Sequence, residues 1–463
     1  MNAIKKKQLL IIVCCICTVS FSKAQTISLQ SLLDRLASNN ELLKSGKSQI
    51  EASRAQVRSA SYNRLPNINT MYQATVGSDN NVQGPYLSMG VIPSVTGGSR
   101  LQSNINPVTG NTALAGIEWE AINFGSYKAQ TDVAKAGLMT QNSLFVKSQY
   151  DLNGIASAYY IELLRQYELA IINKDNVERL QNLLTSINGL IINGIRPGVD
   201  SSIASSELSK SKVALYDAQR GLAQTQAQLA ALTGIPALSI LADTLSGNKI
   251  ISAGDAFAVS AAIDTANNPA IALYSSLYDL SRARLQLEKK RFYPKIFLDA
   301  DAWTRGSSLS STDQFNELQQ GYVPQRFDYF VGLTFTYDLM NIVHKRLSTS
   351  VSKYESDASA HQLEQAKIDI NNSLQQSLIE TEYERKRLNE TSHQLQSASV
   401  AYEQQANLYR NGLSSIIELD VALSYYIQAR KDYLESKVGY MRSIINYSLV
   451  TNSFTSLVQT LKL

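Results

Sequence analysis

The longest unbroken helical pattern of this chain runs from Asn341 to Asn411. It contains neither glycine nor proline, the residues that most often end a helix. Apolar side chains recur within it at the seven-residue spacing of a coiled coil, at Leu388, Leu395, Tyr402 and Tyr409. A second helical pattern returns from Ile416 to about Val450 after a short glycine turn. The shorter arm cannot cover the whole apolar stripe of the longer one, so we predict a helical hairpin that needs further partners.

A different pattern comes before this hairpin. Over residues 329–339, bulky apolar or aromatic side chains at the odd positions alternate with Phe330, Gly332 and then polar residues at the even ones. This period of two predicts a β-strand with one apolar face. We predict its partner strand at 295–303, across a polar loop at 304–326 that contains few apolar side chains.

The same series of elements occurs twice. Asn39-Asn40 recurs as Asn267-Asn268 after 228 residues, and the turn Asn193-Gly194-Ile195 recurs as Asn411-Gly412-Leu413 after 218. Several markers in one order at nearly one offset indicate a tandem duplication. In the first copy we predict helices at 29–37 and 41–64, strands at 68–76 and 114–122 around a polar loop at 77–112, and a long helix from 126. In the second we predict helices at 256–265 and 269–292, the strands given above, and a long helix from 342.

Helix lengths predict one packing relationship. The helix at 41–64 and the return helix at 199–233 together are nearly as long as the long helix of the same copy, and the second copy gives the same result. We therefore predict that two short helices stack end to end beside one long helix in each repeat.

The duplication also sets the domain organisation that we expect. Residues 1–24 have a basic start, a short apolar run and small residues before the end, which are typical of a cleaved secretory signal. The first repeat is expected at 25–233 with its tip at 193–199, a linker at 234–255, and the second repeat at 256–450 with its tip at 411–415. Residues 451–463 form a C-terminal tail.

The signal changes how composition and charge are interpreted. All three cysteines lie inside it, so we expect a mature chain without disulfides, thiolate metal sites or a cysteine nucleophile. Its removal leaves 39 Lys and Arg against 39 Asp and Glu. The precursor pI of 8.7 is therefore no argument for a nucleic-acid partner. No later run is long and apolar enough for a transmembrane helix, so we expect a periplasmic chain, an exported one, or one in the outer membrane as β-strands.

Four strands per chain predict an assembly. Each is about as long as a tilted strand that crosses a bilayer. Strands in lipid must close into a barrel, and the smallest bacterial barrels have eight strands. Several chains must then each contribute four. The 24 tyrosines, against 11 phenylalanines, suit the polar–apolar boundary of a membrane, although tyrosine-rich helices also occur in soluble coiled coils.

The mature chain resembles the TolC-like outer-membrane efflux proteins. The resemblance rests on the duplicated Asn-Asn helix starts, on Trp119 followed by Phe124-Gly125 at a strand exit, and on the two Asn-Gly-(Ile/Leu) turns. It implies a mainly α chain with a membrane β-barrel portion, in a homotrimer of twelve strands and twelve periplasmic helical struts. It also implies a passive exit duct in the outer-membrane lipid. Such ducts serve tripartite efflux or type I secretion systems, together with a periplasmic adaptor and an inner-membrane pump.

The resemblance further implies a gate at the helical tips. Asp200 and Glu418 lie six residues after the tip glycines, and Tyr409 lies three before Gly412, where the family has a latching tyrosine. The chain departs from the family in having Ser414 at the position of a latching arginine. It also has Val421 at a second acidic position, although Asp420 is adjacent.

Simpler explanations exist for each of these residues. Asp200 could be an N-cap, and Glu418 a solvated charge near the positive end of a helix dipole. The tips with Gly194, Ile195, Gly412 and Leu413 are candidates for adaptor docking, but the two apolar side chains could instead make helix C-cap contacts.

Other functions find little support in the sequence. Three histidines lie on one predicted helix without a matching ligand set, and none of the common catalytic or nucleotide-binding strings occurs. We therefore predict neither enzymatic activity nor a cofactor. A structural periplasmic coiled coil or an adhesin-like protein without transport activity remains the alternative, against which the four strands argue.

Overall fold

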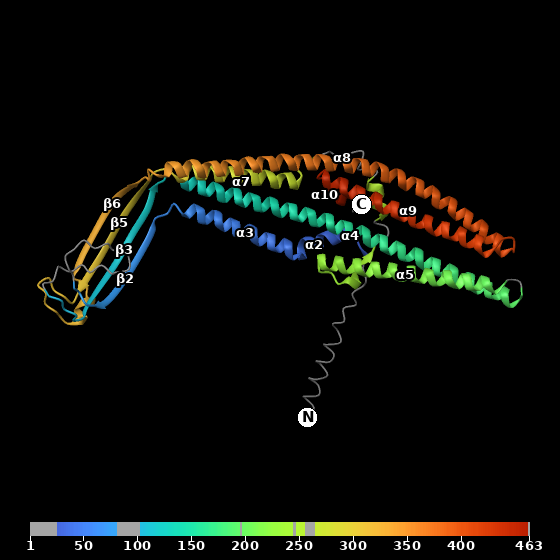
Figure 1. Cartoon of the computed structure of the whole chain (residues 1–463), viewed down its shortest axis with the longest axis horizontal. Helices are drawn as coiled ribbons and strands as arrows, with labels where there is room; N and C mark the ends of the chain where they lie inside the picture. The colour runs from blue at the N-terminus through green and yellow to red at the C-terminus, as the bar shows by residue number, and fades with distance from the viewer. Residues whose placement is uncertain (1–25, 81–101, 195–196, 244–246, 255–263, 462–463) are drawn as a thin grey trace, which may run out of the picture. The chain divides into compact units, whose positions relative to one another are not determined.

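The computed structural model describes residues 26–80, 102–194, 197–243, 247–254 and 264–461. The chain forms two compact units, one of residues 1–50, 140–276 and 360–463 and one of residues 51–139 and 277–359 (Figure 1). The predicted signal at 1–24 and the tip residue Ile195 lie outside the described residues. The same holds for most of the helix predicted at 256–265 and most of the loop predicted at 77–112.

A four-stranded antiparallel sheet occupies the second unit. Its strands are β2 (Asn67–Gly77), β3 (Val108–Ile122), β5 (Lys295–Ser307) and β6 (Arg326–Thr336), in the order β2-β3-β5-β6. The two repeats meet where β3 pairs with β5, with Trp119 opposite Leu298. One face of β6 exposes a row of large apolar side chains, Phe327, Tyr329, Val331, Leu333 and Phe335. Such a face suits lipid rather than water.

The predicted strands and loops need adjustment in both repeats. The loop predicted at 77–112 is too long, since β3 begins at Val108, which pairs with Gly77. The loop predicted at 304–326 is also too long, because β5 continues to Ser307 and the short 3₁₀ helix η2 (Leu318–Tyr322) lies inside it. The strand predicted at 329–339 lies at 326–336. It ends early because the Asp338 carboxylate accepts a hydrogen bond from the Met340 N–H (3.0 Å), which starts a turn before the next helix.

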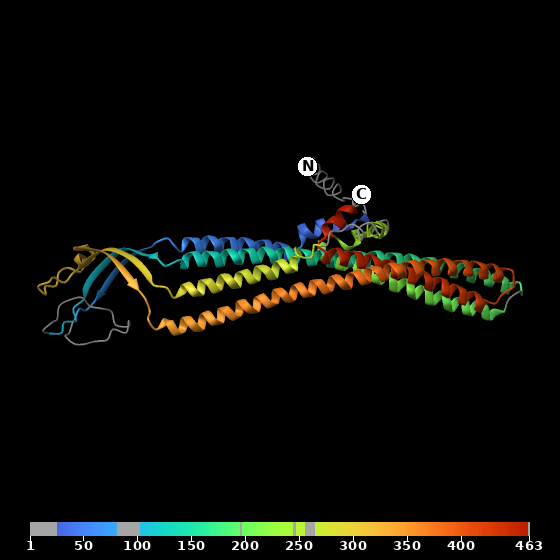
Figure 2. The same ribbon diagram turned by 90° about the horizontal axis from the view of Figure 1, so that it is seen from above.

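The helical segments attached to the strands follow the order of the sheet. These are the ends of α3 (Glu41–Tyr62) and α7 (Pro269–Arg291) and the beginnings of α4 (Ser126–Ile192) and α8 (Asn341–Arg410), and Figure 2 shows the order α3, α4, α7, α8. The starts predicted for the two long helices, 126 and 342, agree with the structure to within one residue. No helix among the described residues is long and apolar enough to cross a membrane.

The first unit holds the main hydrophobic core. Here α4 packs with α9 (Ile416–Val450), α2 (Leu29–Asn39), α5 (Gly198–Thr233) and α10 (Phe454–Thr460). The fully buried side chains include Leu32, Tyr160, Ile161, Leu164 and Leu229. Charged pairs also join α4 to α9, since Arg165 contacts Glu435 and Lys437 contacts Glu168, each at 2.7 Å.

The duplicated asparagines join helices end to end. The Asn40 side-chain oxygen accepts from the N–H of Leu42 (3.0 Å), which caps α3, and its amide nitrogen donates to the carbonyl of Leu232 near the end of α5 (3.2 Å). Asn268 does the same in the second repeat, accepting from Ala270 N–H (2.9 Å) and donating to the Val450 carbonyl at the end of α9 (3.2 Å). One amide therefore satisfies the unpaired groups of two helix ends. This confirms the predicted end-to-end stacking.

Candidate functional site: the helical tips

The helix ends beside the two hairpin turns pack against one another in the first unit. Their cluster contains five buried side chains: Ile187 of α4, Ala204 of α5, Tyr409 of α8, and Ile416 and Leu419 of α9. The tips of the two repeats are thus neighbours, as Figure 1 shows at the ends of the two hairpins. A movement of one hairpin would therefore displace side chains of the other through this cluster.

The second tip is a Schellman turn. The Leu413 N–H donates to the Leu408 carbonyl (2.9 Å), and the Gly412 N–H donates to the Tyr409 carbonyl (3.0 Å). Gly412 has a φ of 77°, which glycine adopts without the steric cost of a Cβ. At the first tip, the N–H of Gly194 (φ 71°) donates to the Ile191 carbonyl (2.9 Å). The recurring Asn-Gly pair is therefore a helix-ending signal in both repeats.

Leu413 points outward from this turn. Its side chain is 73% exposed, so most of its apolar surface is open to a partner. Adaptor docking and the alternative of a helix C-cap contact both stay predictions for Leu413. Other exposed apolar residues stand on the adjoining helix ends, namely Ile192, Val199 and Ile417. Exposed apolar side chains gathered at one place are typical of an interaction surface.

Glu418 makes a capping box at the start of α9. Its carboxylate accepts from the Ser415 N–H (2.9 Å), while the Ser415 hydroxyl accepts from the Glu418 N–H (3.2 Å). The carboxylate nevertheless remains exposed. This geometry gives Glu418 a structural task, and its role in a gate stays a prediction.

Asp200 and Tyr409 are both buried at the tip. Pro197 is the N-cap of α5 and Asp200 lies in the first helical turn, so the alternative that Asp200 is the N-cap is wrong. The Asp200 side chain is only 5% exposed and Tyr409 only 3%. Tyr409 packs with Ile416 and Leu419, as expected of a residue that holds the tip together. A latch between Tyr409 and a carboxylate stays a prediction.

A third acid near the tips, Asp420, has a raised pKa. Burial raises the pKa of the Asp420 carboxyl above its ordinary value of 3.8, and the negative charge of Glu207 on α5 raises it further, whereas Lys210 lowers it. The Asp420 carboxyl on α9 thus interacts electrostatically with the charges of Glu207 and Lys210 on α5. The sequence indicated this residue only as the neighbour of Val421. The closeness of Asp420 to Glu207 could not be predicted from the sequence, because more than 200 residues separate the two.

The sheet carries acids on the face opposite its apolar one. Glu118 stands directly across from Asp299, and Asp301 from Gly116. Asp299 accepts a hydrogen bond from the Thr334 hydroxyl (2.9 Å), and Lys295 pairs with Glu120 (2.9 Å). A polar face behind an apolar face is the arrangement of a barrel wall with a wet interior. Among the described residues, no group of His, Cys, Asp or Glu is suited to hold a metal ion.

The comparisons with known proteins decide the family. The sequence profile of the outer membrane efflux protein family matches residues 32–235 and 264–443, which is most of the chain and both repeats. The chain belongs to the outer membrane efflux protein family. It is therefore an outer-membrane efflux channel protein with a long periplasmic helical portion, as the resemblance predicted.

Solved structures of outer-membrane channels share the fold. VceC of Vibrio cholerae matches with a TM-score of 0.72 at 14% identity, over 92% of this chain and 96% of that one. CmeC of Campylobacter jejuni matches with a TM-score of 0.72 at 14% identity, over 92% and 86%. The open state of Neisseria gonorrhoeae MtrE matches with a TM-score of 0.68 at 15% identity, over 92% and 89%. No curated protein sequence matches significantly.

Proposed function

We propose that three copies of this chain form the exit duct of a tripartite efflux or type I secretion system. The duct passively releases small molecules or proteins that an inner-membrane pump delivers through a periplasmic adaptor. The supporting observation is the open sheet. Within the described chain, β2 and β6 each pair on one side only, and the apolar face of β6 is exposed. Both unpaired edges are satisfied if β6 of one copy pairs with β2 of the next, and the apolar face then contacts membrane lipid.

Twelve strands from three copies then close one barrel, and the same symmetry arranges the helices in a tunnel. In this assembly, we propose that the tips with Gly194, Ile195, Gly412 and Leu413 dock onto the adaptor. Asp200, Glu418 and Tyr409 form the gate. In each copy, residues 25–233 and 256–450 are the two repeats, separated by the linker at 234–255, and each repeat contributes helical struts to the tunnel.

The assembly is tested by mass and by conductance. The purified protein in detergent should have the mass of three chains, and cross-linking should stop at three. Planar bilayers containing it should show discrete channel openings. A dominant monomer or dimer would reject the barrel. A stable trimer without conductance would favour the structural coiled-coil alternative.

A further inference from the structure

A cluster of cations surrounds one tyrosine at the junction between helix and strand. α7 ends at Arg291 and β5 begins at Lys295, with Tyr293 between them. The ammonium of Lys290 lies 4.5 Å from the centroid of the Tyr293 ring, and that of Lys345, from the first turns of α8, lies 4.9 Å from it. The ring thus gathers two positive charges from two helices.

These lysines lack the acidic partners that neighbouring cations have. Arg291 pairs with Glu288 (3.8 Å) and Lys295 with Glu120 (2.9 Å). In the described part of the chain, no carboxylate lies within ion-pair distance of Lys290 or Lys345. A cation–π contact is modest and does not neutralise charge, so the pair remains an uncompensated positive site.

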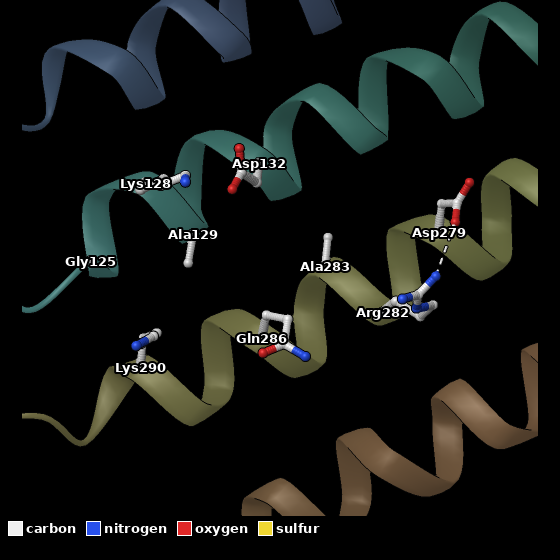
Figure 3. A pocket seen from close by; sticks show the side chains of 9 residues that line it. All are labelled: Gly125, Lys128, Ala129, Asp132, Asp279, Arg282, Ala283, Gln286 and Lys290. Atoms are coloured by element: carbon white, nitrogen blue, oxygen red, sulfur yellow. Dashed lines mark ion pairs between the residues drawn. The ribbon is translucent and has the colours of Figure 1, made fainter.

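A third lysine adds to the same site. Lys128 of α4 and Lys290 of α7 both line a groove of about 490 Å³ between these helices (Figure 3). Asp132 stands one turn along α4 from Lys128, whereas Asp279 lies further along the groove and pairs with Arg282 at 3.9 Å. The lining therefore holds three cations, Lys128, Arg282 and Lys290, against two carboxylates.

Exposed apolar side chains flank the lysines. Two groups of exposed apolar side chains come just before the lysines in the chain. The group before Lys345 contains Leu339, Met340, Ile342 and Val343, and the group before Lys128 contains Ile122 and Phe124. In an outer-membrane protein with periplasmic helices, residues where strand turns into helix lie at the headgroups of the periplasmic leaflet. A phospholipid has a phosphate for the cations and acyl chains for the apolar side chains beside them. A free phosphate ion would leave the apolar side chains without a partner.

We propose that Tyr293, Lys290, Lys345 and Lys128 form a binding surface for an anionic phospholipid of the periplasmic leaflet. The lipid phosphate contacts the ammonium groups, the Tyr293 ring holds Lys290 and Lys345 in place, and the flanking apolar side chains contact the acyl chains. A headgroup with net negative charge, such as that of phosphatidylglycerol, binds in preference to zwitterionic phosphatidylcholine. Each lysine should strengthen binding about fivefold.

Native mass spectrometry of the full chain in detergent tests this surface. The protein is titrated with phosphatidylglycerol or with phosphatidylcholine, and the bound lipids are counted. Wild type should retain phosphatidylglycerol more strongly, and the triple variant Lys128→Gln, Lys290→Gln, Lys345→Gln should lose about a hundredfold of that affinity. The matched control is Lys47→Gln, Lys212→Gln, Lys431→Gln, which removes the same charge elsewhere and should bind as wild type does.

Further variants keep the test decisive. Tyr293→Phe retains the ring and should retain binding, whereas Tyr293→Leu should weaken it. If the triple variant fails to assemble, Lys290→Gln and Lys345→Gln are measured singly, each with about a fivefold loss expected. Equal retention of both lipids by wild type, or an equal loss in the control, would overturn the proposal. Full displacement of the lipid by excess inorganic phosphate would also overturn it, since the surface would then be a phosphate site.

Discussion

The rings of Tyr402 and Tyr426 stack with their centroids 5.4 Å apart and their planes 7° from parallel. The Arg179 guanidinium lies 5.7 Å from the first ring centroid and 5.6 Å from the second. This contact joins α8, α9 and α4, one helix from the first repeat and two from the second. Arg430 lies 5.9 Å from the Tyr426 ring and donates to Asp175 of α4 (3.0 Å), which extends the cluster.

The first prediction concerns this cluster. Arg179→Ala removes a cation shared by two rings and should lower the free energy of unfolding by about 1 kcal/mol. Because the contact links the two hairpins, the variant should also open more readily in planar bilayers. Thermal unfolding and single-channel recording measure the two effects. Arg220→Ala removes an exposed arginine that pairs with Asp217 of its own helix and is the control. Equal melting temperatures for the two variants would contradict the prediction.

The second prediction concerns the carboxylates of the proposed gate. Asp200→Asn and Glu418→Gln together remove up to six negative charges from a trimer, while Gln at 418 can still complete the capping box with Ser415. A constricted ring of negative charge attracts cations, so the double variant should lose cation selectivity and divalent block in planar bilayers. Glu418→Ala is the comparison for stability, since it should cost about 1 kcal/mol through the lost cap. Unchanged selectivity would leave both acids as helix-start residues.

The third prediction is a pH dependence at Asp420. Its pKa is raised in the folded chain, mainly by burial and then by Glu207. The folded state therefore binds the proton more tightly than the unfolded state, and the tips should become more stable as pH falls through the interval between the raised pKa and the ordinary value of 3.8. Asp420→Asn should remove this dependence and stabilise the tips at pH 7 by no more than about 0.5 kcal/mol after solvent screening.

Channel opening measured from pH 7 to pH 4 checks the third prediction. Wild type should open less at the acidic end, and Asp420→Asn should open equally little across the range. Glu207→Gln should show an intermediate response because it removes the second cause of the raised pKa. A wild-type channel that opens more as pH falls would contradict the sign.

The fourth prediction concerns the exposed tip. Leu413→Glu places a charge on the proposed docking surface without touching the hydrogen bonds of the turn. It should abolish adaptor-dependent efflux in cells while leaving conductance in bilayers unchanged, since the charge is solvated until a partner covers it. Leu238→Glu, at another exposed leucine, should leave both unchanged. Loss of conductance in Leu413→Glu would place the residue in the pore instead.

Local signals predicted most of the fold. The absence of glycine and proline from 341 to 411 predicted α8, and the Asn-Gly pairs predicted its end and that of α4. Asn268 caps α7 and Pro269 is its first residue, which is the Asn-Pro order typical of a helix start. These features depend on a few neighbouring residues, so a single sequence contains them.

Contacts between residues far apart in the sequence could not be predicted from such local signals. Arg179 meets Tyr402 and Tyr426 only after the two repeats pack, and no spacing in the sequence relates the three. The exposure of Leu413 and the burial of Asp200 depend likewise on how four helix ends meet. The gate prediction therefore rested on family resemblance, Asp420 included, whereas the structure adds the raised pKa of Asp420 and its closeness to Glu207.

The two duplicated asparagines have a mechanical consequence. Where α5 meets α3 and where α9 meets α7, two helices are joined end to end by side-chain amides rather than by covalent backbone, Asn39 and Asn40 at the first joint and Asn268 and Asn452 at the second. Such a joint can part and re-form without stretching the chain. The helix that ends in a tip, α5 or α9, can then rotate at the joint while α3 or α7 stays in place. The hydrogen bond lost at the joint during repeated opening can be replaced by one to water.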